Sequence, residues 1–502
     1  MAKKKLKFPT AFTVLYIVLV FVAILTYLVP AGQYSKLQYN TESELFIVTT
    51  ARGEVEELPG TQDTIDALNI KVNVEKFRDG SIYRPVAIPN SYERVERNPQ
   101  GFLSVLKAPI SGVYESVDII MFILILGGVI GVINTTGSFD AGIGALSRIT
   151  RGKEYILIIV VTLLIGVGGT TFGLAEETIA LYPILIPVFL ATGYDPIVCI
   201  ASVYMGSSIG TMFSTVNPFS SVIASNAAGV TFTEGLWMRL IGLIIAITIT
   251  IIYILRYGKK VKENPEKSLT YSEREEIHER FLKDYDKSSE VTFTVRRKLM
   301  LSIFALTFIV MTLGVAFWGW WFTEMTALFL LVAIILGFIS GMGEERFVDS
   351  FIGGAADLVS VALIVGVARA INLIMDQGMI SDTILYYSSN VVEGMNSGLF
   401  IIVILLLYIG LGFFIPSSSG LAVLSMPIMA PLADSVGLSR DIIVSAYQYG
   451  QGLIAFITPT GLILATLAMV HVGYNKWFKF ILPLMGMIAA LAVVLLIIQS
   501  FL

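Results

Sequence analysis

The sequence predicts an all-α polytopic membrane protein with about nine transmembrane helices, two re-entrant hairpins and two broken helices. Three observations support this fold class. Of the 502 residues, 55% are hydrophobic and only 14% are charged, whereas a soluble protein carries about 25% charged residues. Several apolar runs reach the ~20 residues that cross ~30 Å of hydrocarbon. Two pairs of shorter apolar runs are each joined by a polar stretch rich in glycine or serine.

The N-terminal region, residues 1–30, is basic and then apolar, with lysines at positions 3, 4, 5 and 7. It is interpreted as a retained first span rather than a signal peptide, because its apolar run is long and the small-residue cleavage pattern is weak. Basic residues stay on the cytoplasmic side, so the N-terminus is expected to be cytoplasmic. The polar residues 31–110, with strand-like alternation at 70–74, are expected to form an extracytoplasmic loop or cap.

Residues 111–255 are expected to form the first repeat. A span at 117–136 ends near Arg148, Arg151 and Lys153, which should be cytoplasmic. The segment 154–192 has two arms of about 14 apolar residues, each too short to cross the membrane. A broken helix at 196–230, interrupted at Asn217-Pro218, and a span at 235–255 follow. Counting back from the basic end of that span puts both ends of 154–192 inside, so this segment should enter the membrane and return.

The remaining chain predicts a second copy in the opposite orientation. Residues 256–298 form a charged cytoplasmic linker, 299–345 two connecting helices, and 346–502 the second repeat. That repeat contains a span at 351–375, an outside loop at 376–398, a hairpin at 399–436 and a broken helix at 438–472. The last span, 477–498, leaves the C-terminus outside.

The two copies share a local pattern. Tyr182-Pro-Ile-Leu-Ile-Pro187 matches Met426-Pro-Ile-Met-Ala-Pro431, and Gly193 matches Gly437 at the same offset. Val117-Asp118 falls on Ala356-Asp357. Inverted repeats that each contain an interrupted helix are typical of a secondary transporter with its site near the membrane midplane.

Three segments carry a resemblance to a known family: FPTAFTVLYIVLVFVAILTYLVPAGQY near the N-terminus, GGTTFGLAEET, and FFIPSSSGLAVLSMPIMAPLAD. The chain resembles YfcC-like members of the DcuC (C4-dicarboxylate carrier) family within the ion transporter superfamily. The resemblance covers essentially the whole chain. It implies a fold similar to the AbgT and dicarboxylate/sodium symporter families, elevator-type motion and a homodimer. YfcC-like members are described as basic amino-acid carriers, including arginine/ornithine exchangers, whereas the wider family moves dicarboxylates.

The first polar tip carries the strongest clue to the substrate. Residues 168–178 place Thr170, Thr171, Gly173, Glu176 and Glu177 at membrane depth. Carboxylates there are costly and usually functional. One or both glutamates are expected to pair with the ammonium or guanidinium of a basic amino acid. Alternatively, they pair with an internal Arg or Lys, or lie in water on the cytoplasmic side.

Arg369 and Asn372 lie one turn apart in the span at 351–375. The arginine is expected either to hold a substrate carboxylate or to be the structural partner of Glu176, Glu177 or Asp376. Asp118 and Asp357 are expected to be interfacial, because each lies close to the end of a predicted span.

The second tip and the two breaks supply neutral candidates for the site. Ser417, Ser418, Ser419 and Gly420 could bind a carboxylate at helix N-termini, although capping needs only one serine. The breaks, at Ser214 and Asn217 and at Thr458 and Thr460, expose carbonyls and hydroxyls that suit Na⁺ or polar substrate groups. The alternative is a simple proline kink. Coupling to Na⁺, coupling to H⁺ and exchange remain open.

Other classes are disfavoured by composition. The single cysteine, Cys199, excludes an intrachain disulfide, and the two histidines, His278 and His471, are far apart. No resident cofactor, firm metal site, enzyme activity or nucleic-acid partner is expected. The two leading functions are a basic amino-acid carrier and a C4-dicarboxylate or other carboxylate carrier coupled to Na⁺ or H⁺. A channel is the remaining alternative, because re-entrant loops also build selectivity filters.

Overall fold

The structure is a computed structural model of the 502-residue chain. It describes residues 10–501 except 71, 81, 83, 140, 143, 144, 146–151, 172, 283–291, 319, 393 and 394. Of the expected basic cluster after the second span, Arg148 and Arg151 therefore lie outside the described residues.

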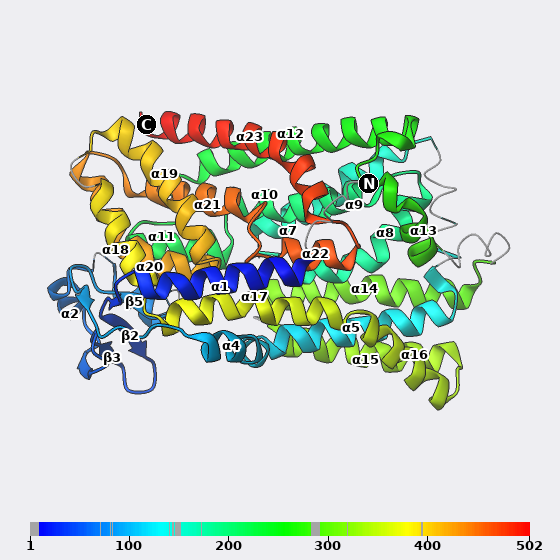
Figure 1. The fold of residues 1–502 in the computed structure, drawn as a ribbon, viewed down its shortest axis with the longest axis horizontal. Coiled ribbons are helices and arrows are strands. Elements are labelled where there is room, and N and C mark those ends of the chain that lie inside the picture. Colours follow the sequence, from blue (N-terminus) through cyan, green and yellow to red (C-terminus); the bar gives the residue numbers. More distant parts are fainter. Residues whose placement is uncertain are drawn as a thin grey trace, which may run out of the picture.

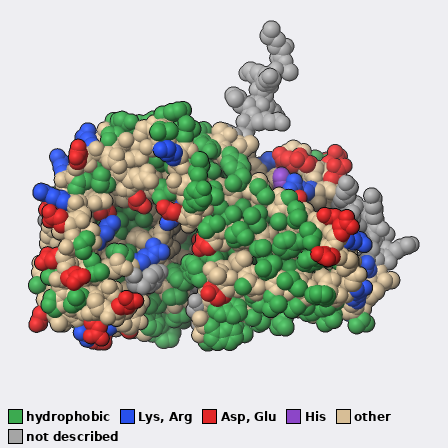
Figure 2. Space-filling view, turned by 90° about the horizontal axis from the view of Figure 1, so that it is seen from below, with side chains coloured by type: hydrophobic (Ala, Val, Ile, Leu, Met, Phe, Trp, Pro, Cys, Tyr) green, Lys and Arg blue, Asp and Glu red, His purple; other side chains and the backbone are tan. Residues whose placement is uncertain are grey.

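The molecule is mostly helical and elongated, with its long helices roughly along one direction (Figure 1). Seven described helices are long and apolar enough to cross a membrane by length and composition: α1 (Ala11–Leu28), α5 (Val117–Thr135), α12 (Leu236–Glu263), α15 (Phe322–Ser340), α17 (Val359–Gln377), α19 (Ser397–Phe414) and α23 (Tyr474–Gln499). On the face shown in Figure 2, hydrophobic side chains cover a broad part of the surface, and charged side chains gather mainly toward the two ends. This distribution is that of a multi-pass membrane protein.

A small β-rich region follows the first helix, α1 (Ala11–Leu28), at one end of the molecule (Figure 1). An antiparallel sheet has the order β4-β3-β2-β5, with Leu37 opposite Val48, and β1 pairs with β6. The elements are β1 (Gly32–Gln33), β2 (Lys36–Asn40), β3 (Leu45–Thr49), β4 (Val55–Pro59), α2 (Gln62–Ala67), α3 (Glu75–Arg78), β5 (Val86–Ala87) and β6 (Glu93–Arg94). Phe46 and Phe77 are fully buried and pack edge to face, so this region has its own small core.

Two kinked rods lie antiparallel. One consists of α4 (Phe102–Glu115) and α5 (Val117–Thr135), and the other of α16 (Glu344–Asp357) and α17 (Val359–Gln377). Glycines let their backbones touch. A Cβ on Gly112 would meet the Gly366 carbonyl oxygen at 2.1 Å, and one on Gly131 would meet the Ser350 carbonyl oxygen at 2.2 Å. Close approach through small residues is the usual way in which membrane helices pack.

Two helices lie outside the expected spans. Helix begins at Phe102, inside the segment expected to be an extracytoplasmic loop, and Asp118 lies after the kink, in the first turn of the apolar helix α5. The expected outside loop at 376–398 contains another helix, α18 (Ser381–Val392), which holds the β-rich region. There the Tyr34 backbone N–H donates to Asp382 at 3.0 Å, and the Tyr92 ring stacks on Tyr386.

The rest of the molecule is built from two similar halves. The first has α7 (Tyr155–Thr171), a 3₁₀ helix (Glu176–Leu181), α8 (Tyr182–Ala191), α9 (Pro196–Ile200), a π-helical turn (Ala201–Met205), α10 (Gly206–Met212), a second π-helical turn (Pro218–Val222), α11 (Ile223–Ala228) and α12 (Leu236–Glu263). The second has α19 (Ser397–Phe414), α20 (Ser418–Ser435), α21 (Arg440–Ala455), α22 (Ile463–Met469) and α23 (Tyr474–Gln499).

In each half, the first arm runs parallel to the first part of the broken helix. Glycine contacts pair Gly166 with Gly210 in α7 and α10, and Gly450 with Tyr408 in α21 and α19. The chain that follows α7 returns to the place where α7 begins. Glu154 and Gly193 both lie beside Lys262 near the end of α12, with 2.8 Å between the Glu154 carboxylate and the lysine Nζ.

The remaining helices connect the halves. The linker contains two 3₁₀ turns (Pro265–Lys267 and Tyr271–Glu273) and α13 (Arg274–Leu282), followed by α14 (Val295–Trp318) and α15 (Phe322–Ser340). α14, α15 and α5 share a second hydrophobic core, which includes Phe122, Phe304 and Phe329 and also Ala180 and Val188 of the first half. This core is distinct from the large one around the broken helices.

Candidate functional site

The first tip contacts the first break directly. α7 ends at Thr171, and Gly173 adopts a left-handed conformation with φ 77°, which allows the chain to turn sharply. The Thr170 carbonyl accepts from the backbone N–H groups of Thr215 and Val216, each at 3.3 Å. The Asn217 side-chain amide donates to the Gly169 carbonyl at 3.1 Å. Four predicted residues, Thr170, Gly173, Ser214 and Asn217, thus belong to one junction or border it.

Asn217 also caps the helix after the break. Its side-chain oxygen accepts from the Phe219 backbone N–H at 2.8 Å, while Pro218 stands at the first helical position. Asparagine as a cap and proline at the first position are the expected start of a helix. The Asn-Pro pair therefore starts a new helix, and residues 213–217 before it lie outside regular helix. A kink in a continuous helix would leave no such gap.

The second tip meets the second break in a similar way. The Thr460 hydroxyl donates to the Phe413 carbonyl at 3.3 Å, and Thr458 and Thr460 share a hydrogen bond of 2.7 Å. Ser417 caps α20 by accepting from the Gly420 backbone N–H at 3.2 Å. The Gln451 amide donates to the Pro416 carbonyl at 3.2 Å. The four adjacent positions Ser417 to Gly420 thus form the N-cap and first turn of α20.

Glu176 and Glu177 follow the turn of the first tip and lie on its side toward α5. They open the 3₁₀ helix that packs against α5, and both are partly buried. Asp118, in the first turn of α5, is close enough to Glu176 for the two carboxylates to repel each other. The Glu177 carboxylate accepts from the Ala175 backbone N–H at 3.1 Å. Among the described residues, no Lys or Arg forms an ion pair with any of the three acids, although such a cluster normally needs a cation or a proton.

Arg369 is paired elsewhere. Its Nε donates to Glu115 Oε2 at 3.0 Å, and both side chains are more than two-fifths exposed. Its partner is therefore none of the three carboxylates expected, because the helix that carries Glu115 begins earlier than the hydropathy pattern indicated. Asn372 has a buried side-chain oxygen that finds no hydrogen-bond partner among the residues that the structure describes. Thr171 turns its hydroxyl back to the Val167 carbonyl at 2.6 Å, so neither it nor Arg369 is engaged at the tip junctions.

Several residues near the junctions were missing from the sequence prediction. Gln448 donates from Nε2 to Ser214 Oγ at 2.5 Å and to Ser220 Oγ at 3.2 Å. Tyr447 donates to the Ser418 carbonyl at 2.7 Å. Gln448 and Gln451 are polar residues inside an apolar span, a signal that could have identified them. Arg84 could not be found this way: it belongs to the β-rich region, yet its Nη1 lies 3.6 Å from the position of a Cβ on Gly420.

A family model decides the class of the protein. The model for DcuC, described as a C4-dicarboxylate anaerobic carrier, matches residues 8–501. The chain belongs to the DcuC family. This membership, together with the apolar helices, places it among multi-pass secondary transporters, so it is a carrier and not an enzyme.

Two individual relatives match nearly the whole chain. A protein of Haemophilus influenzae described as uncharacterized is 49% identical over 99% of this chain and 98% of its own length. The putative basic amino acid antiporter YfcC of Escherichia coli is 29% identical over 97% of this chain and 96% of its own length.

Two solved structures also align with the DcuC-family chain. MtrF of Neisseria gonorrhoeae, which belongs to a class of antimetabolite efflux pumps, has a TM-score of 0.38 at 17% identity and covers 99% of this chain and 96% of its own. The YdaH transporter of Alcanivorax borkumensis has a TM-score of 0.38 at 13% identity and covers 97% and 98%.

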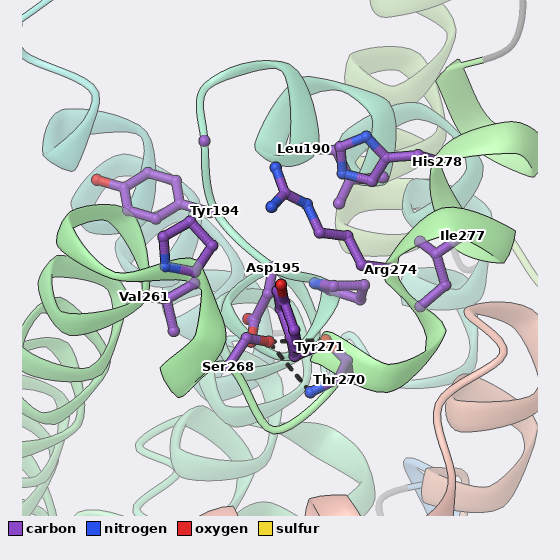
Figure 3. A pocket seen from close by; sticks show the side chains of 13 residues that line it. Leu190, Tyr194, Asp195, Val261, Ser268, Thr270, Tyr271, Arg274, Ile277 and His278 are labelled. Carbon is purple, nitrogen blue, oxygen red and sulfur yellow. Dashed lines mark hydrogen bonds between the residues drawn. The ribbon is translucent and has the colours of Figure 1, made fainter.

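A pocket of this DcuC-family protein lies away from both tips, between the turn after α8 and the linker (Figure 3). Asp195 is buried there and accepts hydrogen bonds from Tyr257 and Ser268, each at 2.6 Å. Burial raises the pKa of Asp195, and these two hydrogen bonds oppose that effect. Because its partners join the turn to α12 and to the linker, this cluster fastens the linker to the first half.

Proposed function

We propose that this DcuC-family carrier moves basic amino acids, by arginine/ornithine exchange. The observation that carries the proposal is the cluster of Glu176, Glu177 and Asp118, three carboxylates with no cationic partner among the described side chains. A guanidinium or ammonium group of the substrate would supply the missing charge. The description of the YfcC relative as a putative basic amino acid antiporter points the same way.

The opposite end of the substrate would bind at the second tip. Serine hydroxyls and the N-terminus of α20 suit an α-carboxylate, and Arg84 beside Gly420 adds positive charge. An acidic cluster at one tip and a basic group at the other match an α-amino acid with a cationic side chain.

The transport mechanism would be of the elevator type, in a homodimer. The segments 154–192 and 399–436 would be re-entrant hairpins, and together with the broken helices they would move past a fixed unit that contains α5, α14 and α15. The open backbone at 213–217 and the threonines at 458 and 460 remain candidates for a coupling Na⁺.

A C4-dicarboxylate carrier is the second candidate. The family description favours it, and Arg84 at the second tip is suited to an anion. In this case the acidic cluster would bind the coupling ion, H⁺ or Na⁺, and not the substrate.

Counterflow in proteoliposomes distinguishes the two candidates. Preloaded ornithine should accelerate the entry of labelled arginine, and external succinate should not compete. Glu177→Gln and Glu176→Gln should each reduce arginine exchange at least ~100-fold while the purified proteins keep a monodisperse elution profile, because a buried charge pair loses one partner. Competition by succinate without arginine counterflow would contradict the proposal, and full exchange by both variants would remove the glutamates from the site.

A further inference from the structure

The two broken helices cross, and each sends one polar side chain into the break of the other. From α21, Gln448 Nε2 reaches the Ser214 and Ser220 hydroxyls on either side of the first break. From the first broken helix, the Tyr204 hydroxyl donates to the Ala455 carbonyl at the second break, at 2.7 Å. Tyr204 and Gln448 are separated by 244 residues, the spacing that also relates Gly193 to Gly437. The two side chains are therefore equivalent positions of the repeat.

The equivalent positions differ in how completely their polar atoms are satisfied. The Tyr204 hydroxyl is satisfied, because it donates to the Ala455 carbonyl. Gln448 is 2% exposed, and its Oε1 has no partner among the described residues. A buried carbonyl oxygen without a hydrogen bond is costly, so natural proteins rarely keep one without a reason. Of these two equivalent side chains, Gln448 is therefore the one whose Oε1 needs a hydrogen-bond donor from outside the chain.

The surroundings of Gln448 define that donor. Its partners Ser214 and Ser220, and the neighbouring Asn217, are neutral and buried. With Nε2 held by two serine oxygens, the free Oε1 acts as an acceptor. It can take a hydrogen bond from an N–H group, but it would repel the oxygens of a carboxylate.

We infer that Gln448 is a specificity-determining residue whose Oε1 accepts a hydrogen bond from the α-ammonium group of the substrate. This inference rests on the proposed function and deepens it. The side-chain cation binds at the Glu176 and Glu177 cluster, the carboxylate at the second tip, and the α-ammonium at the crossing of the broken helices. A dicarboxylate has no group that could satisfy this acceptor.

The test compares arginine with 5-guanidinopentanoic acid, which lacks only the α-ammonium group. Wild-type protein, Gln448→Met and Gln448→Glu are reconstituted, and KM is measured for arginine and for the analogue. Tyr253→Phe is the control, because it removes one partly buried hydrogen bond between α12 and α23, to the Phe480 carbonyl, and leaves Gln448 and its two serine partners in place. Thermal unfolding and elution profiles check that each variant is folded.

We expect wild-type protein to prefer arginine over the analogue about tenfold, the effect of one hydrogen bond to a charged group. Gln448→Met should raise KM for arginine about tenfold and leave KM for the analogue unchanged, so that the preference disappears. Gln448→Glu keeps an acceptor and should bind arginine at least as well as wild type. The control should keep the wild-type preference.

Two results would overturn the inference while the proposed function stands. One is an arginine preference that survives in Gln448→Met. The other is a higher arginine KM in Gln448→Glu than in Gln448→Met, which would show that the amide faces a carboxylate. Absence of arginine counterflow in the wild-type protein would contradict the proposed function, and the inference with it.

Discussion

Single residues at the ends of the helices fix how the first half closes. Glu154, just before α7, meets Lys262 near the end of α12, and the Lys262 Nζ also lies over the Tyr194 ring at 5.7 Å. These three residues hold the two ends of the segment 154–194 at one place. The hydrogen bond from Lys262 lowers the pKa of Glu154 to about 2.

This pair should make stability depend on pH. Because the folded-state pKa of Glu154 lies below its ordinary value of 4.5, its contribution is complete above about pH 4.5 and is lost as the pH falls toward 2. Glu154→Gln should lower the free energy of unfolding by about 1 kcal/mol at pH 7, a modest value because Lys262 is 38% exposed. Thermal melts at pH 7, 5 and 3.5 should show the gap between wild type and variant narrowing only at the lowest pH, where part of it remains. A constant gap would contradict the pairing.

At the scale of elements, the arms and broken helices are joined through glycine. A Cβ on Gly210 would stand 2.3 Å from the Gly166 carbonyl oxygen, and one on Gly169 would stand 2.6 Å from the Ser207 carbonyl oxygen. These contacts bring α7 against α10 and let the first tip reach the break. The separation of the two helices therefore determines whether Thr170 and Asn217 can take part in one junction.

Gly210→Val should force α7 and α10 apart. Overpacking of this kind costs about 1–3 kcal/mol, so the unfolding temperature should fall and substrate exchange should be impaired. Gly486→Ala is the matched control, because Gly486 lies in α23 with nothing within 4 Å. It should unfold at the wild-type temperature or slightly above it, since alanine favours helix over glycine. Equal melting of Gly210→Val and wild type would show that the two helices are not in contact.

At the scale of the whole molecule, the two halves are expected to have opposite orientations in the membrane. The same order of elements occurs twice. The rod α4–α5 precedes the first copy, the rod α16–α17 precedes the second, and the two rods lie antiparallel. The start of α7 lies with the linker, whereas the start of α19 follows α18 and the β-rich region (Figure 1). The two pairs of arms therefore start from opposite ends of the molecule.

Labelling of single cysteines tests this arrangement in cells. Cys199 is the only native cysteine and is buried, so a Cys199→Ala background is suitable. In that background, Gly398→Cys should react with a membrane-impermeant maleimide in intact cells, because its position is exposed at the start of α19. Lys153→Cys, exposed before α7, should react only after the membrane is opened. Labelling of both positions in intact cells would contradict opposite orientations.

The sequence by itself determined the class of protein and the positions of most helices. Apolar length, charge between the spans and the proline and glycine pattern are local properties, and membrane helices depend mainly on such properties. The breaks at Asn217-Pro218 and Thr458-Pro459 were visible for the same reason, since proline removes a backbone donor.

Only the tertiary structure decided which polar groups meet. Asp118, in the first turn of α5, lies close to Glu176 of the first tip. Arg369 pairs with Glu115 from the neighbouring rod, and Gln448 reaches Ser214 across 234 positions of sequence. Such pairings depend on how helices pack and on the low dielectric between them, which makes each unmatched group costly. Neither is encoded in the spacing of residues along one helix.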